Sequence, residues 1–203
     1  MESNNINALT EQSENALAEL GNIGAGNAAT SLSVMLGTKL SVTPPSVHVY
    51  SFDELEQVLG GPEQTVIGVL STITGDINAM LLFVCTTEDA VNLTKVLFKT
   101  DIEWHSDMGL SAVKEIANII LSSYASSIET LTGMKVRCTQ PEISIDMAAA
   151  ILSVPCIEFG KVGDKALVIN SEFYAGDMQI NGYIMAISDI HSYDTMLSKF
   201  GIQ

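Results

Sequence analysis

Two short stretches carry a carboxylate and an amide three residues apart, Glu19-Leu-Gly-Asn22 and Glu115-Ile-Ala-Asn118. On a helix, residues three or four apart are surface neighbours, so each Glu would lie beside its Asn. An amide donates and accepts hydrogen bonds at once, so it can hold a polar group such as a water molecule. Asparagine is unfavourable inside helices because its side chain competes for backbone hydrogen bonds. Its presence in both stretches therefore indicates a use beyond folding.

The two stretches belong to a longer internal repeat. They are separated by 115 − 19 = 96 residues. At that offset five further residues are matched, pairing Ala29, Ser31, Gly37, Lys39 and Pro45 with Ala125, Ser127, Gly133, Lys135 and Pro141. Further on, Ile77-Asn78 resembles Ile180-Asn181 at an offset of 180 − 77 = 103, so the halves differ by a few inserted residues. A register kept over this length predicts a duplicated structural unit.

Each half predicts the same order of elements. In the first half we expect a long helix from its N-cap Thr10 to Leu36, stopped by Gly37. An extended segment interrupted by Pro44-Pro45 follows, and Gly75-Asp76 is a plausible hairpin turn. The remaining expected elements are a short helix 52–59, strands 66–73 and 77–86, and a helix 87–98. In the second half the expected elements are 106–132, 135–145, 146–152, 165–174, 179–188 and 190–200.

This order predicts a mixed fold, α/β in the broad sense and α+β more narrowly. We expect residues 1–203 to form a single pseudo-twofold-symmetric domain, with repeats at about 10–100 and 106–200. A central, mostly antiparallel sheet would be covered by the long helices, because each helix must bury its apolar stripe.

Helical periodicity divides each long helix into an apolar face and a polar stripe. The expected core residues are Leu17, Leu20, Gly24, Ala28, Leu32 and Met35 in the first copy and Val113, Ile116, Ile120, Tyr124, Ile128 and Leu131 in the second. The expected outward stripes are Asn15, Glu19, Asn22, Gly26, Ala29 and Ser33, and Ser111, Glu115, Asn118, Ser122, Ala125 and Glu129. The core faces differ between the copies, whereas Glu and Asn stay in both stripes.

These motifs resemble those of the CheC, CheX and FliY phosphatases of bacterial chemotaxis. The family motif is Ser or Asp, three residues, Glu, two residues, Asn, and a Pro some twenty residues later. Ser111, Glu115, Asn118 and Pro141 match it; in the first copy Glu19, Asn22 and Pro45 match, but Asn15 stands where the family has Ser or Asp. Two copies spread over essentially the whole chain, with no appended domain, are typical of the CheC type.

The resemblance implies hydrolysis of the aspartyl phosphate of the response regulator CheY. Asn22 and Asn118 would position the attacking water, Glu19 and Glu115 would pair with a lysine of the regulator, and Asn15, Ser111, Pro45 and Pro141 would support them. Mg²⁺ would belong to the regulator, and this chain would bind no metal or other cofactor. The family also implies the receptor deamidase CheD as a partner, bound through the short helix 146–152, with Asp146, Met147 and Ala150.

Two other functions fit parts of the sequence. A non-catalytic chemotaxis or flagellar-switch module would keep the fold and bind a regulator or CheD, although docking alone does not require an amide in both stripes. The run Gly24-Ala-Gly26-Asn-Ala-Ala29 fits a dinucleotide fingerprint, but such a fingerprint must follow a strand and open a helix. Here the preceding residues are already helical, so we expect no nucleotide site.

Composition excludes several other functions. Nine basic and 24 acidic residues give a net charge of −15, which disfavours nucleic acid and anionic membranes as partners. The apolar runs are too short to span a bilayer. Residues 1–7 lack the basic and apolar parts of a secretory signal, so we expect a cytoplasmic protein. Cys85, Cys138 and Cys156 lack a C-x-x-C spacing and are expected to be buried free thiols, and the three histidines are isolated.

Overall fold

The computed structural model describes residues 10–159, 165–175, 178–188 and 190–202. The first half contains α1 (Glu11–Leu36), β1 (Leu40–Val42), β2 (Ser46–Ser51), α2 (Phe52–Val58), β3 (Thr65–Gly75), β4 (Ala79–Thr86) and α3 (Thr87–Phe98). The second contains α4 (Asp107–Thr132), β5 (Val136–Cys138), β6 (Glu142–Met147), α5 (Ala148–Phe159), β7 (Lys165–Ala175), β8 (Met178–Ser188) and α6 (Ile190–Lys199). The order of elements is the same in both halves, which confirms the predicted repeat and mixed fold. The N-terminal stretch 1–7, from which we expect the absence of a signal, lies outside the described residues.

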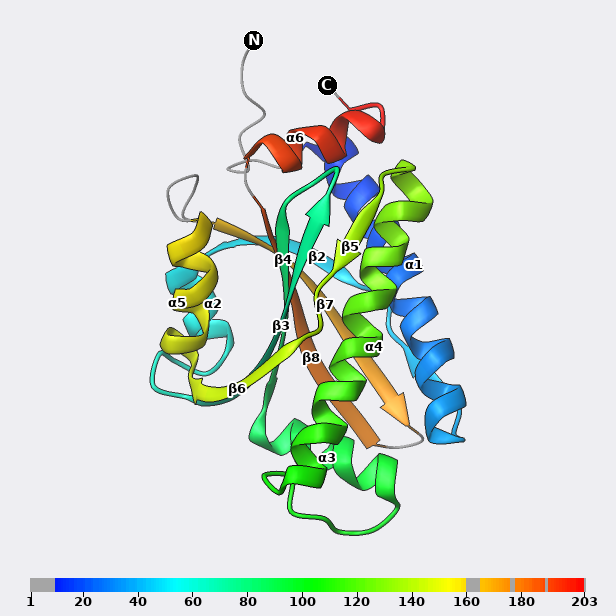
Figure 1. Ribbon diagram of the computed structural model, residues 1–203, viewed down its shortest axis with the longest axis vertical. Coiled ribbons are helices and arrows are strands. Elements are labelled where there is room, and N and C mark those ends of the chain that lie inside the picture. Colours follow the sequence, from blue (N-terminus) through cyan, green and yellow to red (C-terminus); the bar gives the residue numbers. More distant parts are fainter. Residues whose placement is uncertain (1–9, 160–164, 176–177, 189, 203) are drawn as a thin grey trace.

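The two halves share one antiparallel sheet by exchanging their edge strands (Figure 1). β1 and β2 of the first half pair with β7 of the second, and β5 and β6 of the second half pair with β3 of the first. In the middle, β4 pairs with its counterpart β8, with Leu81 opposite Ala186. Each half therefore completes the sheet of the other, as expected for a pseudo-twofold arrangement. The domain boundaries 1–203 stay a prediction.

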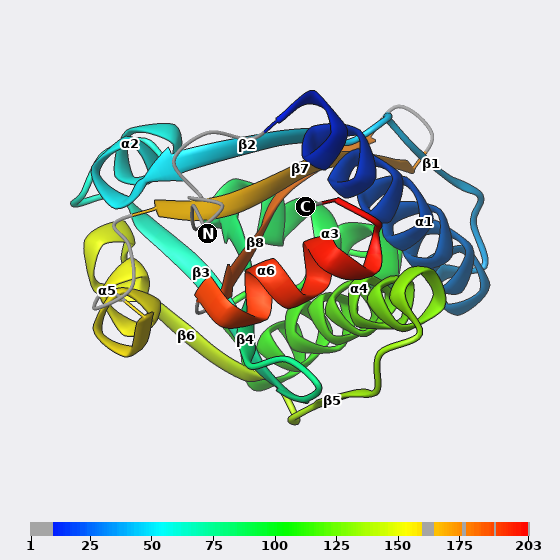
Figure 2. The same cartoon turned by 90° about the horizontal axis from the view of Figure 1, so that it is seen from above.

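Helices cover both faces of this sheet (Figure 2). Side chains of α1, α3, α4 and α6 form one buried apolar cluster with residues such as Ile67 and Ile169. α2 and α5 form a second cluster on the opposite face with Val66, Leu82 and Val168. Strand β3 contributes to both clusters, so it reads as a continuous apolar run and not as an alternating one. None of the described helices is long and apolar enough to cross a membrane.

The ends of the two long helices are set by local sequence signals. The side chains of Thr10 and Ser106 accept hydrogen bonds from the backbone N–H groups of Ser13 and Gly109, both at 3.2 Å. At the other ends, Gly37 and Gly133 adopt left-handed conformations with φ of 59° and 69°, which glycine reaches without strain. The predicted cap and stop of the first helix are confirmed, and the second helix uses the same devices.

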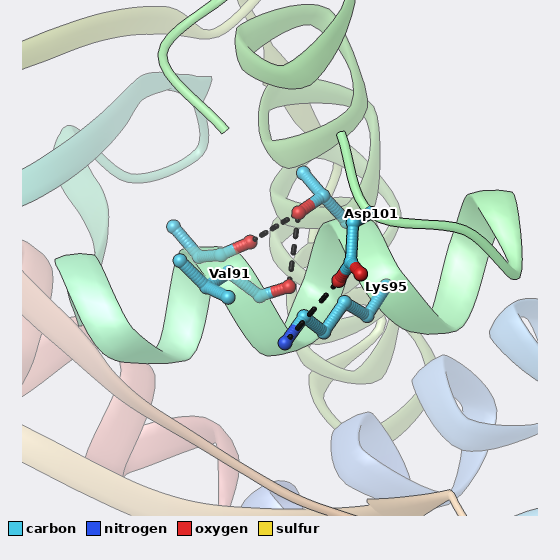
Figure 3. A network of polar contacts seen from close by, with 5 residues as sticks. Val91, Lys95 and Asp101 are labelled. Carbon is cyan, nitrogen blue, oxygen red and sulfur yellow. Dashed lines mark hydrogen bonds and ion pairs between the residues drawn. The ribbon is translucent and has the colours of Figure 1, made fainter. Parts of the chain in front are cut away.

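Polar contacts within α3 and one exposed ion pair lie next to the connection between α3 and α4 (Figure 3). The hydroxyl of Thr94 donates to the carbonyls of Ala90 and Val91 at 3.0 and 2.9 Å, inside α3. Lys95 Nζ lies 3.4 Å from Asp101 Oδ1, but the two side chains are 43% and 91% exposed. An ion pair this exposed contributes at most about 1 kcal/mol. The position of α4 therefore depends mainly on its buried face.

The predicted bounds of the helix 146–152 are wrong at both ends. Asp146 and Met147 are the last residues of strand β6, where they pair with Val66 and Thr65 of β3. The helix α5 starts at Ala148 and continues past Pro155 to Phe159. Strand pairing keeps residues 146 and 147 extended, and the burial of Pro155 and Phe159 retains the helix beyond the segment that local sequence favours.

Candidate active site

The two motif helices α1 and α4 lie side by side and run in opposite directions (Figures 1 and 2). They approach closely at Gly24, where a Cβ atom would lie 2.9 Å from the ring of Tyr124. Tyr124 is buried, and its hydroxyl lies 2.9 Å from that of Ser171 in β7, with which it shares a hydrogen bond. Burial raises the pKa of Tyr124 to about 12, against the opposing effect of that hydrogen bond. Glycine in one helix thus makes room for tyrosine in the other.

The carboxylates and amides of both motifs lie on the solvent side of this helix pair. Glu19, Asn22 and Glu115 are exposed, and Asn118 is half-buried. The supporting residues Asn15 and Ser111 are exposed as well. The orientation expected from helical periodicity is therefore observed in both copies.

The motif side chains make few contacts with the rest of the protein. Asn118 Oδ1 accepts a long hydrogen bond of 3.5 Å from the hydroxyl of Ser122, one turn further along α4. For the Asn22 side chain no hydrogen bond is recorded within the part of the chain that the structure describes. Over the same residues, the ion pairs involve neither Glu19 nor Glu115. Both carboxylates and both amides are therefore available to a second molecule.

The two prolines of the motif lie at the starts of strands next to the helices. Pro45 precedes β2 and packs on α1, because a Cβ atom at Gly21 would lie 3.0 Å from Pro45 Cγ. Gly21 directly precedes Asn22, so this contact fixes the helix backbone beside the amide. Pro141 is buried immediately before β6. Their supporting role remains a prediction, and the Gly21 contact gives it a physical basis in the first copy.

A polar groove of about 420 Å³ follows the seam between the two helices. We call it the interhelix groove; its lining residues are Asn27, Thr30, Ser31, Asn118, Ile119, Ser122, Ser123 and Ser126. Asn118 and Ser122 were expected on the outward stripe, but the three residues from α1 were not assigned to any site. Hydroxyl and amide groups on a helix carry no distinctive signal in the sequence, and only the packing of α4 beside α1 brings them together.

Two residues of the expected polar stripes are buried. Ala29 and Ala125 are 7% and 5% exposed. Residues seven apart drift by about 20° around a helix for each heptad, so a stripe that begins at Asn15 or Ser111 turns inward two heptads later. Ala29 and Ala125 therefore belong to the core, whereas Glu129, the last residue of the second stripe, is exposed.

A second surface surrounds the residues expected to bind CheD. Asp146 and Met147 are exposed at the end of β6, and Ala150 is half-buried in α5. Close by in sequence, Ile145, Val154 and Ile157 are exposed apolar side chains, with Ile157 77% exposed. A groove of about 330 Å³ between β6, β3 and α5 adjoins them. The sequence identified this region but assigned its first two residues to the wrong element.

The structure gives little support to other kinds of chemistry. The glycine-rich run 24–29 lies in the middle of α1 and not at a strand-to-helix turn, so the dinucleotide interpretation is not supported. Among the described residues, no group of three or more His, Cys, Asp and Glu side chains could hold a metal ion. The three cysteines are free. Cys138 is exposed and Cys156 half-buried, so their expected burial is confirmed only for Cys85, whose thiol pKa burial raises strongly.

Comparison with known proteins identifies similar chains. Residues 13–49 and 108–145 match the model of the CheC-like family. The chain is 27% identical to "CheY-P phosphatase CheC" of Bacillus subtilis over 97% of each protein. It is 26% identical to "Flagellar motor switch phosphatase FliY" of the same organism over 144 residues, which is 69% of this chain and 37% of that protein.

Solved structures share the fold at lower sequence identity. Thermotoga maritima FliY superposes with a TM-score of 0.76 at 22% identity, covering 96% of this chain and 98% of that one. The FliM middle domain of H. pylori gives a TM-score of 0.68 at 13% identity, covering 94% and 99%. A CheX protein from Desulfovibrio desulfuricans gives 0.51 at 18% identity, covering 84% and 99%. The predicted fold class is thereby confirmed.

Proposed function

Because this chain belongs to the CheC-like family, we propose that it is a cytoplasmic protein phosphatase that hydrolyses the aspartyl phosphate of a CheY-type response regulator. The observation that carries the proposal is the position of the two motifs. The matched segments 13–49 and 108–145 each contain one Glu-x-x-Asn motif, and the structure exposes the Glu of both motifs on one helix pair. The similarity to a CheY-P phosphatase along 97% of the chain supports the same activity.

In the proposed reaction, Asn22 or Asn118 holds the attacking water. Hydrolysis of an aspartyl phosphate requires a water in line with the bond that breaks. An amide can accept a hydrogen bond from that water through Oδ1 and donate another through Nδ2, so it fixes both position and orientation. Positioning of this kind removes orientational entropy from the barrier. Mg²⁺, bound by the regulator, would stabilise the charge on the phosphoryl group, and this chain would contribute no metal ligand.

The carboxylates of Glu19 and Glu115 are assigned to docking. A carboxylate beside a phosphoryl group would be repelled, whereas a pair with a lysine of the regulator would be charge-assisted and directional. Neither carboxylate has an ion-pair partner among the described residues, so no internal contact must break first. The net charge of −15 argues against long-range attraction to an acidic regulator. Affinity would then rest on local contacts at the helix pair.

A turnover assay tests this proposal. A substoichiometric amount of the protein should shorten the lifetime of phosphorylated regulator in the presence of Mg²⁺, because only an enzyme acts repeatedly. Replacing both Asn22 and Asn118 by Ala should lower the rate by roughly two to three decades, as for other lost preorganised polar contacts. Asn78→Ala, an exposed asparagine between β3 and β4, is the matched control and should retain full activity. Full activity of the double variant would refute the mechanism.

The second candidate function is a non-catalytic interaction module. FliM of H. pylori, whose middle domain is one of the solved structures with this fold, has also been crystallised in a complex with FliG. A module of that kind would bind the regulator but would lengthen, or leave unchanged, the lifetime of its phosphate. The same turnover assay separates the two functions, since binding without acceleration would favour the module.

We also propose that α5 and the end of β6 bind the receptor deamidase CheD. Three exposed apolar side chains, Met147 at the end of β6 and Val154 and Ile157 on α5, support this surface, because exposed large apolar groups mark interaction sites. Ile157→Asp should abolish binding to CheD in a titration. Val34→Asp introduces the same charge at an 81% exposed apolar residue of α1 and should leave binding intact. Equal binding by both variants would contradict the assignment.

A further inference from the structure

We infer that the exposed face of the antiparallel pair α1 and α4 is one docking surface shared by both motifs, so that a chain with two motifs holds one regulator at a time. This inference rests on the proposed function and concerns how its two sites relate in space.

The interhelix groove shows that the two helices form one continuous surface. Its lining combines Asn27 and Thr30 of α1 with Ser122 and Ser126 of α4, and of the four Glu and Asn motif residues only Asn118 lines it. The first motif is exposed on α1 of the same helix pair. A protein that docks at Asn118 therefore meets residues of both helices.

The two amides lie at different levels of the helix pair. Gly24 meets Tyr124, so in antiparallel helices Asn118, six residues before Tyr124, lies level with Thr30, six residues after Gly24. By the same register, Asn22 lies level with Ser126. Asn22 and Thr30 are eight residues apart on α1, which at 1.5 Å per residue separates the two amides by about 12 Å along the helix. Packed helices lie about 8–10 Å apart, so the two amides are separated by roughly 15 Å in total.

This separation is smaller than the footprint of a regulator. A stable interface covers about 800 Å² on each partner, which is a patch roughly 30 Å across. A single domain of about 120 residues has a radius of gyration of about 14 Å, so it is about 35 Å wide. Two such domains centred roughly 15 Å apart would occupy the same space. The antiparallel helices thus present one surface that accepts a regulator in either of two opposite orientations.

The stoichiometry of the complex is the first test. The regulator is activated with beryllofluoride, a stable mimic of the phosphoryl group, and added in excess to the full chain. Analytical ultracentrifugation should give a complex of one chain with one regulator. A complex with two regulators per chain would overturn the inference.

The maximal rate provides the second test. Glu19→Lys and Glu115→Lys each reverse the charge of one docking carboxylate and leave a single working motif. If docking is exclusive, the kcat of the wild-type protein lies between the kcat values of the two variants. A wild-type kcat equal to their sum would show independent sites and overturn the inference.

The two tests also separate this inference from the proposed function. A wild-type protein that binds the regulator without turnover would refute the phosphatase activity, and the stoichiometry would still decide whether the motifs share one surface. A phosphatase that binds two regulators would refute only the sharing.

Discussion

Helices α1 and α4 present similar polar stripes on very different interiors. In its middle, α1 has Gly21, Gly24 and Gly26 where α4 has Ala117, Ile120 and Ser122. Each glycine in a helix interior costs about 0.5–1 kcal/mol relative to alanine, so α1 depends more on its packing than α4 does. The two helices therefore share the outward Glu and Asn, whereas their inward residues differ and fit together. Gly24 of α1, for example, leaves room for the ring of Tyr124 of α4.

The stripes themselves also differ at their N-terminal ends. Met108 lies on the same helix face as Ser111 and Glu115 and is 58% exposed. Its counterpart on α1 is the polar Gln12, since 108 − 96 = 12. The second motif therefore combines the complete family pattern with an exposed apolar side chain that the first motif lacks. We expect the second motif to be the stronger one.

The largest expected effect compares the two amides. Asn118→Ala should lower activity by roughly tenfold or more, because the remaining first motif is incomplete, whereas Asn22→Ala should cost less than about threefold. Both variants are measured for kcat/KM with phosphorylated regulator and Mg²⁺. Equal losses would remove the ranking of the motifs and leave the mechanism in place.

The next effect concerns the stability of α1. Gly24→Ala places a methyl group against the buried Tyr124 ring, and overpacking of this kind typically costs about 1–3 kcal/mol, partly offset by helix propensity. At Gly26 no atom lies within 4 Å of the added Cβ, so Gly26→Ala should stabilise by about 0.5–1 kcal/mol. Urea unfolding measures both free energies. Stabilisation by both substitutions would show that the two helices do not pack closely at Gly24.

A smaller effect depends on pH. Tyr124→Phe removes the hydrogen bond with Ser171 and should lower the free energy of unfolding by about 1 kcal/mol near neutral pH. Burial raises the pKa of Tyr124 to about 12 in the folded protein. The contribution of the neutral Tyr124 phenol to the free energy of unfolding is therefore fully present below about pH 10, the ordinary pKa of tyrosine. That contribution is lost as the pH rises toward 12.

Between pH 10 and 12 the free energy of unfolding should therefore fall less in the Tyr124→Phe variant than in the wild-type protein. Because burial also raises the pKa of Tyr193 to about 12, both proteins should still weaken in that range. The measurement is urea unfolding at pH 8 and pH 11. A stability difference that is the same at both pH values would contradict the burial of Tyr124.

The smallest expected effect tests the apolar end of the second stripe. Met108→Gln copies the residue of the first stripe and should raise KM by about threefold, equivalent to roughly 0.7 kcal/mol of lost apolar contact, with kcat unchanged. Gln12→Met is the matched reverse change and should lower KM. A fall in kcat for Met108→Gln with no change in KM would show that Met108 does not act in docking.

Much of the fold followed from the sequence because its signals are local. Thr10 and Gly37 are ordinary helix signals, and the start of the first helix and its left-handed stop are found where they predict. The helix 87–98 agrees with α3 at both ends. Segment 146–152 failed because strand pairing with β3, which is not local, decides the conformation of Asp146 and Met147.

The sequence by itself determined the duplicated motif, its helices and the outward direction of Glu and Asn, because these depend on spacing along one helix. Tertiary structure alone decided that the first half's edge strands pair with the second half's hairpin, that α1 and α4 run antiparallel, and that a groove beside Asn118 follows the seam between them. Those features arise from contacts between residues far apart in the chain. Helical periodicity shows which face is apolar but not which partner covers it.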